Sequence, residues 1–149
     1  MTTLFKESFR CAFCNKLFED YILGSTNTLG GMDTELRTYA LGIQPIAYFI
    51  HCCPFCGFTD STHDIKLSTE EKRKIGEYLK SYCLQRKPKS FSSSEKYKIY
   101  ANILKLRKMP SLVVADAYLN AAWMADDENN ELSKEYRKEA LCKRQKDLH

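Results

Sequence analysis

The sequence predicts an α+β protein in which a small zinc-ribbon-like β part precedes an antiparallel helical part. Two Cys-x-x-Cys pairs with 38 residues between them lie within residues 1–67, an arrangement typical of a metal-bound ribbon. Apolar residues recur at helical spacing from Ser68 onward, which is typical of packed amphipathic helices. We therefore expect a four-cysteine metal-binding part over residues 1–67 and a helical hairpin or bundle over residues 68–149.

Length and composition indicate an ordinary globular chain. It has 149 residues, of which 44% are hydrophobic and 28% are charged, values usual for one domain or a small domain with an appendage. The first residues form no apolar run of the kind found in secretory signals. The longest apolar stretch, residues 112–125, is too short for a bilayer and contains Asp116 and Asn120. These features favour a cytoplasmic location and no membrane partner.

Residues 9–60 show the composition of short strands and turns. Phe18, Tyr21 and Leu23 follow the first cysteine pair and suit a strand or hairpin. The glycine pair at residues 30–31 marks a turn. Residues 46–50 are rich in β-branched and aromatic side chains and lead into the second cysteine pair, so we expect a strand there.

The seven cysteines indicate a metal site before disulfides, because their number is odd and the expected compartment is reducing. Cys11, Cys14, Cys53 and Cys56 would supply a complete tetrahedral shell for one structural zinc ion, with no position for a catalytic water. A rubredoxin-like iron site and a redox dithiol at one pair are the alternatives. Cys52 adjoins Cys53, but only Cys53 has the two-residue gap to Cys56.

Other potential ligands are expected to have different roles. His51 and His63 flank the second cysteine pair and would bind metal only if a cysteine did not. We expect them on the surface or in contact with the metal-binding residues. Cys83 and Cys142 fall on helical faces and are expected to be small core residues.

Four helices are expected after residue 67. The first begins at Ser68, which forms a capping box with Glu71. The second begins near Ser94, after a linker over residues 87–94. The third has Pro110 in its first turn and extends to about residue 125, and the fourth covers residues 131–146. The side chains expected to face inward are Ile75, Leu79, Tyr82, Cys83, Tyr97, Tyr100, Ala101, Leu104, Leu132, Tyr136 and Ala140.

The segment over residues 33–58 is more specific than a generic ribbon. Its features in order are Asp33-Thr34-Glu35-Leu36-Arg37-Thr38-Tyr39, Gly42-Ile43-Gln44-Pro45, Tyr48 and Cys53-Pro54-Phe55-Cys56-Gly57-Phe58.

With the first cysteine pair, these features resemble the uncharacterised prokaryotic family called domain of unknown function 2225. The resemblance implies a zinc-ribbon-like N-terminus and a helical C-terminal part related to tetratricopeptide repeats, and it implies no activity. Gln44 stands where the family pattern has asparagine. The chain of 149 residues is shorter than typical members and leaves room for one degenerate repeat at most.

The insertion between the cysteine pairs contains Asp33, Arg37 and Gln44, for which two interpretations remain open. In the first, Arg37 binds a carboxylate or phosphate of a ligand and Asp33 orients it. In the second, Asp33 caps a turn and Arg37 pairs with it to brace the loop against the ribbon. The second is favoured, because one arginine is weak evidence for a ligand site.

The net charge of +4 is unevenly distributed along the chain. Residues 68–108 hold 12 basic and four acidic residues, a net charge of +8, whereas residues 1–67 and 109–149 each carry −2. This basic segment could contact phosphates, and Phe91, Tyr97 and Tyr100 within it could stack on bases. The alternative, favoured by the inward spacing of the two tyrosines, is a solvated helical face.

The sequence contains no P-loop, nucleophile elbow or zinc-protease motif. We therefore expect a non-enzymatic zinc-binding scaffold or adaptor that docks on a protein partner. Trp123, Tyr118 and the alanines at 121 and 122 are candidates for a groove that accepts a partner helix. The alternative is close packing of the third helix against its neighbours, and both interpretations can apply to different faces. The alternative function is a nucleic-acid- or ribosome-associated protein that uses the basic segment over residues 68–108.

Overall fold

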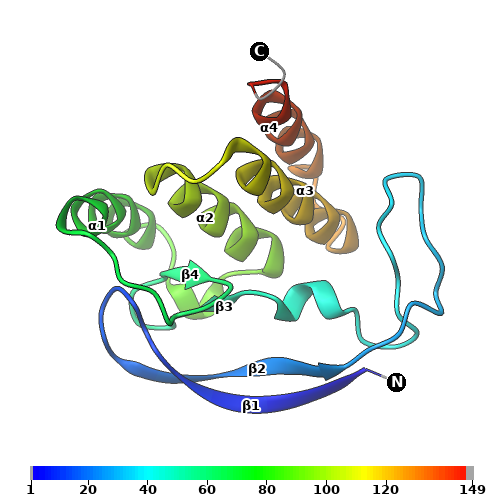
Figure 1. Cartoon of the computed structure of the whole chain (residues 1–149), viewed down its shortest axis with the longest axis horizontal. Helices are drawn as coiled ribbons and strands as arrows, with labels where there is room; N and C mark the ends of the chain where they lie inside the picture. Colours follow the sequence, from blue (N-terminus) through cyan, green and yellow to red (C-terminus); the bar gives the residue numbers. More distant parts are fainter. Residues whose placement is uncertain (1, 147–149) are drawn as a thin grey trace.

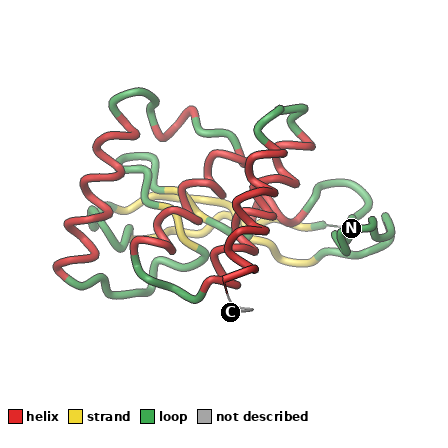
Figure 2. The backbone as a smooth tube through the Cα atoms, turned by 90° about the horizontal axis from the view of Figure 1, so that it is seen from above, coloured by secondary structure: helices red, strands yellow, loops and turns green. Residues whose placement is uncertain are grey.

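The computed structural model describes residues 2–146 and places a layer of helices over a layer of short strands (Figure 1). Seen from above, the strands run beneath the helices (Figure 2). The predicted α+β class is confirmed, while residues 147–149 of the expected helical part lie outside the described residues. The elements are β1 (Thr3–Arg10), β2 (Leu17–Ser25), β3 (His51–Cys52), β4 (Thr59–Asp60), α1 (Thr69–Cys83), α2 (Ser93–Leu106), α3 (Ser111–Asp127) and α4 (Ser133–Lys146).

Each Cys-x-x-Cys pair lies in the turn of an antiparallel hairpin. β1 pairs with β2 from Thr3 opposite Ser25 to Arg10 opposite Leu17, and β3 pairs with β4 around the second pair. β1 is missing from the sequence-based prediction, because most of its side chains are exposed and several are polar. Its extended conformation depends on backbone pairing with β2 more than on burial of an apolar face.

The strand predicted over residues 46–50 is wrong. Residues Pro45–Tyr48 form a short 3-10 helix with proline at its first position, where the missing N–H costs no hydrogen bond. Ile46 and Ile50 are both buried against the helices. Their spacing of four residues suits one face of a helical turn. The strand prediction followed the β-branched composition of the segment and missed this helical spacing.

The predicted start of the first helix is confirmed. Ser68 Oγ accepts a hydrogen bond from the Glu71 N–H at 3.1 Å, and Glu71 Oε1 accepts one from the Ser68 N–H at 3.1 Å. Ser92 and Glu95 form a second capping box, which begins α2 at Ser93. Two local side-chain motifs therefore define where the chain enters its helices.

The later helices differ in detail from the prediction. Pro110 occupies the N-cap position, one residue before the first turn of α3. α4 begins at Ser133, because Asn130 Oδ1 accepts a hydrogen bond from the Leu132 N–H and holds residues 130–132 in a turn. Leu132, expected to face inward, is 39% exposed, whereas Tyr136 and Ala140 are buried as expected. Within residues 2–146, no helix is both long and apolar enough to cross a membrane.

Two apolar clusters fill the core, and α2 contributes to both. The knuckle-side cluster joins α1 and α2 to the cysteine-bearing turns, and its buried members are Cys11, Phe18, Cys53, Phe58, Ile75, Leu79, Phe91, Ile99 and Ile103. The helical cluster joins α2, α3, α4 and the 3-10 helix, and its members include Ile46, Ile50, Tyr97, Ala101, Leu104, Val114, Tyr118, Tyr136 and Ala140. The core thus crosses the predicted part boundary at residues 67–68, and the division into two parts stays a prediction.

Shortening a side chain of α2 that packs in the knuckle-side cluster should destabilise the whole chain. Ile103 is fully buried in the knuckle-side cluster, so Ile103→Ala should lower the free energy of unfolding by about 3 kcal/mol. Leu112, on α3, is 53% exposed, and Leu112→Ala should cost less than about 0.5 kcal/mol. Urea denaturation measures both values, and equal losses would contradict this assignment of the core.

Candidate metal centre and its surroundings

The sulfur atoms of Cys11, Cys14, Cys53 and Cys56 converge on one point. All four lie within 4.8 Å of one another. Cys11 Sγ is 3.5 Å from Cys56 Sγ, and Cys14 Sγ is 3.6 Å from Cys53 Sγ. Disulfide sulfurs would be about 2 Å apart, whereas four sulfurs around a tetrahedral zinc lie roughly 3.8 Å apart, given a bond of about 2.3 Å. The donor set therefore fits a metal ion, and it brings together the four residues predicted from the sequence.

The two cysteine-bearing turns have the same backbone geometry. The residue after each second cysteine has a positive φ, 64° at Asn15 and 84° at Gly57. The Asn15 N–H donates to the Cys11 carbonyl at 3.0 Å, and the Gly57 N–H donates to the Cys53 carbonyl at 2.9 Å. Asparagine and glycine are the residues that most readily adopt this left-handed conformation. Each turn is closed locally, so each pair of sulfurs is positioned by its own hairpin.

Backbone N–H groups stabilise negative charge on the sulfurs. The N–H groups of Phe13 and Cys14 donate to Cys11 Sγ at 3.4 and 3.5 Å. The Phe58 N–H donates to Cys56 Sγ at 3.4 Å. Such N–H donors favour thiolates, which are the metal-binding form of cysteine.

Four thiolates at this spacing need a cation between them. Hydrogen bonds from Cys11 and Cys56 to the Cys53 sulfur lower the pKa of that thiol. The hydrogen bond to Cys53 is the main reason that the pKa of Cys11 is raised to about 12. Without a metal the cluster retains protons, and a cation that binds all four sulfurs must displace them.

His63 connects the two cysteine-bearing turns without joining the sulfur cluster. Its Nδ1 accepts a hydrogen bond from the Ala12 N–H at 3.3 Å, and its Nε2 donates to the His51 carbonyl at 2.9 Å. Burial lowers the pKa of His63, which is consistent with this neutral tautomer. His51 Nδ1 lies 3.0 Å from Asp20 Oδ2. His63 therefore contacts the first cysteine-bearing turn, which is one of the two roles expected of it, whereas the His51 side chain contacts Asp20 of β2 and Phe9 of β1.

The remaining cysteines lie outside the sulfur cluster. Cys52 Sγ donates to the carbonyls of Cys53 and Gly57 at 3.6 and 3.7 Å, so the metal set contains Cys53 and not its neighbour. Cys83 Sγ donates to the Cys56 carbonyl at 3.6 Å, which links α1 to the second turn. Cys142, expected in the core, is exposed, because it lies on the outer face of α4.

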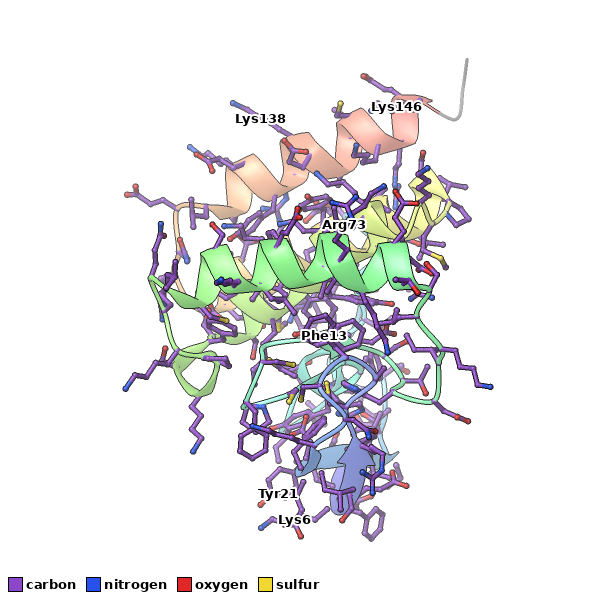
Figure 3. The ribbon with its side chains drawn as sticks, turned by 90° about the vertical axis from the view of Figure 1, so that its left-hand side faces the viewer. Lys6, Phe13, Tyr21, Arg73, Lys138 and Lys146 are labelled. Carbon is purple, nitrogen blue, oxygen red and sulfur yellow. The ribbon has the colours of Figure 1, made fainter. Side chains whose placement is uncertain are left out.

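α1 packs directly on the first cysteine-bearing turn. Phe13 lies beneath α1 in the side view (Figure 3). A Cβ atom at Gly76 would lie 3.2 Å from the Phe13 ring, so the absence of a side chain at this position of α1 permits the close approach. The helical layer thus rests on the metal-binding turns through an aromatic contact.

The family model described as "Uncharacterized protein conserved in bacteria (DUF2225)" matches residues 4–146. This chain belongs to the DUF2225 family. No curated protein and no solved structure matches it. The match covers both cysteine-bearing turns and helices α1 to α4, so the DUF2225 region includes the four-cysteine cluster and the helical layer together.

Asp33 and Arg37, the DUF2225 residues considered as a ligand site, brace the insertion instead. Asp33 Oδ1 accepts hydrogen bonds from the N–H groups of Glu35 and Arg37, at 2.9 and 3.1 Å, so it caps a turn as predicted. The Arg37 side chain does not pair with Asp33. It donates to Asp127 Oδ1 at 3.0 Å and Oδ2 at 2.6 Å, and it is only 4% exposed. The brace therefore reaches α3, and the expected contact with the ribbon is wrong.

Aromatic rings and a second arginine complete this brace. The Arg37 guanidinium lies 4.6 Å from the Tyr39 ring centroid and 5.8 Å from that of Trp123, distances favourable for cation–π attraction. Arg137 of α4 donates to Glu35 at 2.7 Å and to Asp126 at 2.5 Å. These contacts connect one insertion to both of the last two helices.

Gln44 has a separate structural role. Its Oε1 accepts a hydrogen bond from the Ala40 N–H at 3.1 Å, and its Nε2 donates to the Ala40 carbonyl at 2.8 Å. The side chain thus closes the loop over residues 40–44 on itself. Ala121 and Ala122 are fully buried in the helical cluster, so these two residues are close-packed, and a groove at Trp123 stays a prediction.

The basic segment does not form one continuous cationic site. Arg107 is paired with Asp60 at 3.3 Å and Glu71 at 3.1 Å. The lysines at 87 and 89 precede α2, whereas those at 105 and 108 lie at its other end, about 20 Å away for a helix of this length. Phe91 and Tyr97 are buried, so they are not available for base stacking. For these two aromatic residues, the core interpretation is confirmed.

Loss of one sulfur ligand should release the metal. Cys14→Ser and Cys56→Ser should each abolish tight metal binding and loosen residues 9–60, because binding free energy is part of the folding free energy here. Cys52→Ser is the matched control and should retain the metal. Elemental analysis of the purified proteins gives metal content, with zinc expected, and hydrogen exchange reports loosening. Loss of metal in the Cys52 variant and retention in a Cys53→Ser variant would contradict the assignment.

The Arg37 brace should contribute to stability in the absence of any ligand. Arg37→Gln removes a bidentate pair in which the arginine is buried and Asp127 is partly exposed, and it should lower the free energy of unfolding by about 2 kcal/mol. Arg144→Gln is the control: its pair with Asp116 at 2.9 Å is exposed, so the loss should be below about 1 kcal/mol. Denaturant unfolding measures both. An Arg37 variant with unchanged stability would favour the ligand-binding interpretation.

Proposed function

We propose that this chain is a non-enzymatic adaptor in which a structural zinc ion holds two hairpin turns together beneath a helical docking layer. The observation that supports it is the convergence of four cysteine sulfurs within 4.8 Å. Four thiolates fill a tetrahedral shell, as in structural zinc sites, whereas catalytic zinc sites keep one position for water. The chemistry supplied by the ion is cross-linking of the fold.

Zinc is proposed over iron because of how the sulfurs are held. Each pair lies on a hairpin turn that closes on its own backbone, and the segment between β2 and β3 contacts the helices through Arg37, Ile46 and Ile50. Zinc suits such rigid tetrahedral sulfur sites and needs no redox partner. A rubredoxin-like iron site uses the same donors and is the competing occupant.

Exposed apolar side chains support the docking part of the proposal. Three leucines of the insertion, Leu29, Leu36 and Leu41, are 73%, 74% and 58% exposed. Leu112 and Leu141, on α3 and α4, are also more than half exposed. Three of these five leucines belong to the one insertion, and exposed apolar side chains in such a segment are candidates for contact with a partner.

Nucleic-acid or ribosome association remains the second candidate function. The observation that favours it is that Lys87, Lys89, Lys105 and Lys108 form no ion pair with any residue of the described range 2–146. Their separation at the two ends of α2 weakens this candidate, because phosphate binding depends on several cations acting together.

The two functions differ in their response to salt. Tagged zinc-loaded protein should capture a protein partner from a lysate of the source organism at low and at high salt, with or without nuclease. The Cys56→Ser variant should capture none. Phosphate-driven association would instead weaken steeply with added salt. Capture that disappears with nuclease or high salt would support the second candidate, and capture that survives metal loss would contradict a zinc-dependent docking layer.

A further inference from the structure

His63 is a polar side chain buried among aromatic rings beside the metal centre. It is 8% exposed, and its ring centroid lies 5.1 Å from that of Phe18, 5.5 Å from that of Phe58 and 6.0 Å from that of Phe9. Burial of a polar ring in such surroundings is unfavourable unless its nitrogens form hydrogen bonds. Both nitrogens do, and both partners are backbone groups close to the metal-binding cysteines.

The first partner belongs to the peptide unit that follows Cys11. The Ala12 N–H donates to His63 Nδ1 at 3.3 Å, while the Asn15 N–H donates to the Cys11 carbonyl at 3.0 Å. The Cys11 carbonyl and the Ala12 N–H lie in one planar peptide unit. This unit is therefore held at both of its polar groups, which fixes the backbone from which the Cys11 side chain reaches the other sulfurs.

The second partner lies on the strand that leads into the other cysteine-bearing turn. His63 Nε2 donates to the His51 carbonyl at 2.9 Å, and this carbonyl shares a peptide unit with the N–H of Cys52. β3 pairs with β4, and the Cys53 N–H donates to the Phe58 carbonyl at 2.9 Å, so β3 and the second turn form one hydrogen-bonded unit. A single imidazole thus connects the two backbone segments that supply the four sulfurs.

The two turns differ at the position that His63 contacts. Their closing hydrogen bonds are equivalent, but Ala12 of the first turn corresponds to Pro54 of the second. Proline fixes its own φ angle and has no N–H, so the second turn is restricted at this position without an external partner. Alanine leaves φ free and has an N–H that requires an acceptor. His63 supplies that acceptor and restricts the first turn as the proline restricts the second.

We propose that His63 is a positioning residue of the metal centre, which raises the affinity for the metal by holding the first cysteine-bearing turn and β3 together through its two ring nitrogens. This inference rests on the structural zinc ion proposed above and assigns a residue that strengthens its binding. The alternative is that His63 serves only as a ring in the aromatic cluster. The two differ in what the nitrogens contribute.

The main test compares two buried histidines that have different partners. His63→Phe keeps a ring and removes both nitrogens, so it should weaken zinc binding to the full chain at least about tenfold in competition with a chromophoric chelator. His51→Phe is the matched control, because His51 is 5% exposed and its side chain bonds Asp20 of β2. Its affinity should change by less than about threefold. Cobalt(II) absorption should show the same four-thiolate site in both variants.

A second pair of variants tests the comparison with Pro54. His63→Ala removes the acceptor and leaves space beside Ala12 for a proline ring. The affinity lost in His63→Ala should be recovered by at least about threefold in Ala12→Pro/His63→Ala, because proline fixes φ and removes the unpaired N–H. In the zinc-loaded wild type, nitrogen-15 NMR of the ring should show a protonated Nε2 and an unprotonated Nδ1.

Five results would overturn the role of His63. These are unchanged affinity in His63→Phe, an equal loss in His51→Phe, a cobalt spectrum that changes when His63 is replaced, no recovery in the proline variant, and a protonated Nδ1 in the wild type. The last measurement needs no variant and decides the question if the variants do not fold. Failure of the zinc function is distinguishable, because a wild type that binds neither zinc nor cobalt contradicts both proposals. Tight zinc binding that His63→Phe leaves unchanged contradicts the role of His63 alone.

Discussion

The convergence of four sulfur atoms is the constraint on which the rest of this structure depends. It joins two hairpin turns that are far apart in the sequence, and each hairpin has only two strands. Isolated two-stranded hairpins are at best marginally stable in water. Phe13 of the first turn and Cys83 of α1 then connect this centre to the helical layer. A metal held by the four sulfurs would therefore fix the support on which α1 and α2 pack.

The sequence predicts the parts of the fold that are encoded by neighbouring residues. The cysteine pairs identify the metal centre, since each depends on a spacing of three positions, and the Ser68–Glu71 capping box identifies the start of α1. The contact between Arg37 and Asp127 joins residues 90 positions apart, and no local pattern in the sequence indicates that partner. β1 is also hidden, because its conformation depends on pairing with β2 and little on its own side chains.

In the insertion between the cysteine pairs, the residues that suggested a ligand site have structural roles. Asp33 shapes a turn, Arg37 fastens that turn to α3, and Gln44 closes the following loop. Glu35 and Arg137 extend the same attachment to α4. The charged groups of Asp33 and Arg37 already form hydrogen bonds and an ion pair within the protein. A binding site for a partner is therefore expected at a surface whose charged residues form no ion pair. The surface of α2 that carries Lys98 and Lys105 is one candidate, because neither lysine forms an ion pair within residues 2–146.

α2 provides a physical connection between the metal centre and that surface. Ile99 and Ile103 pack in the knuckle-side cluster, while Lys98 and Asn102 of the same helix line a groove beside α4. Close-packed interiors transmit strain, so a change in the support under the isoleucines would also reach the adjacent residues Lys98 and Asn102. The proposed zinc ion would thereby have a role beyond stability, because it would help to fix the position of α2 and of the lysines that this helix exposes.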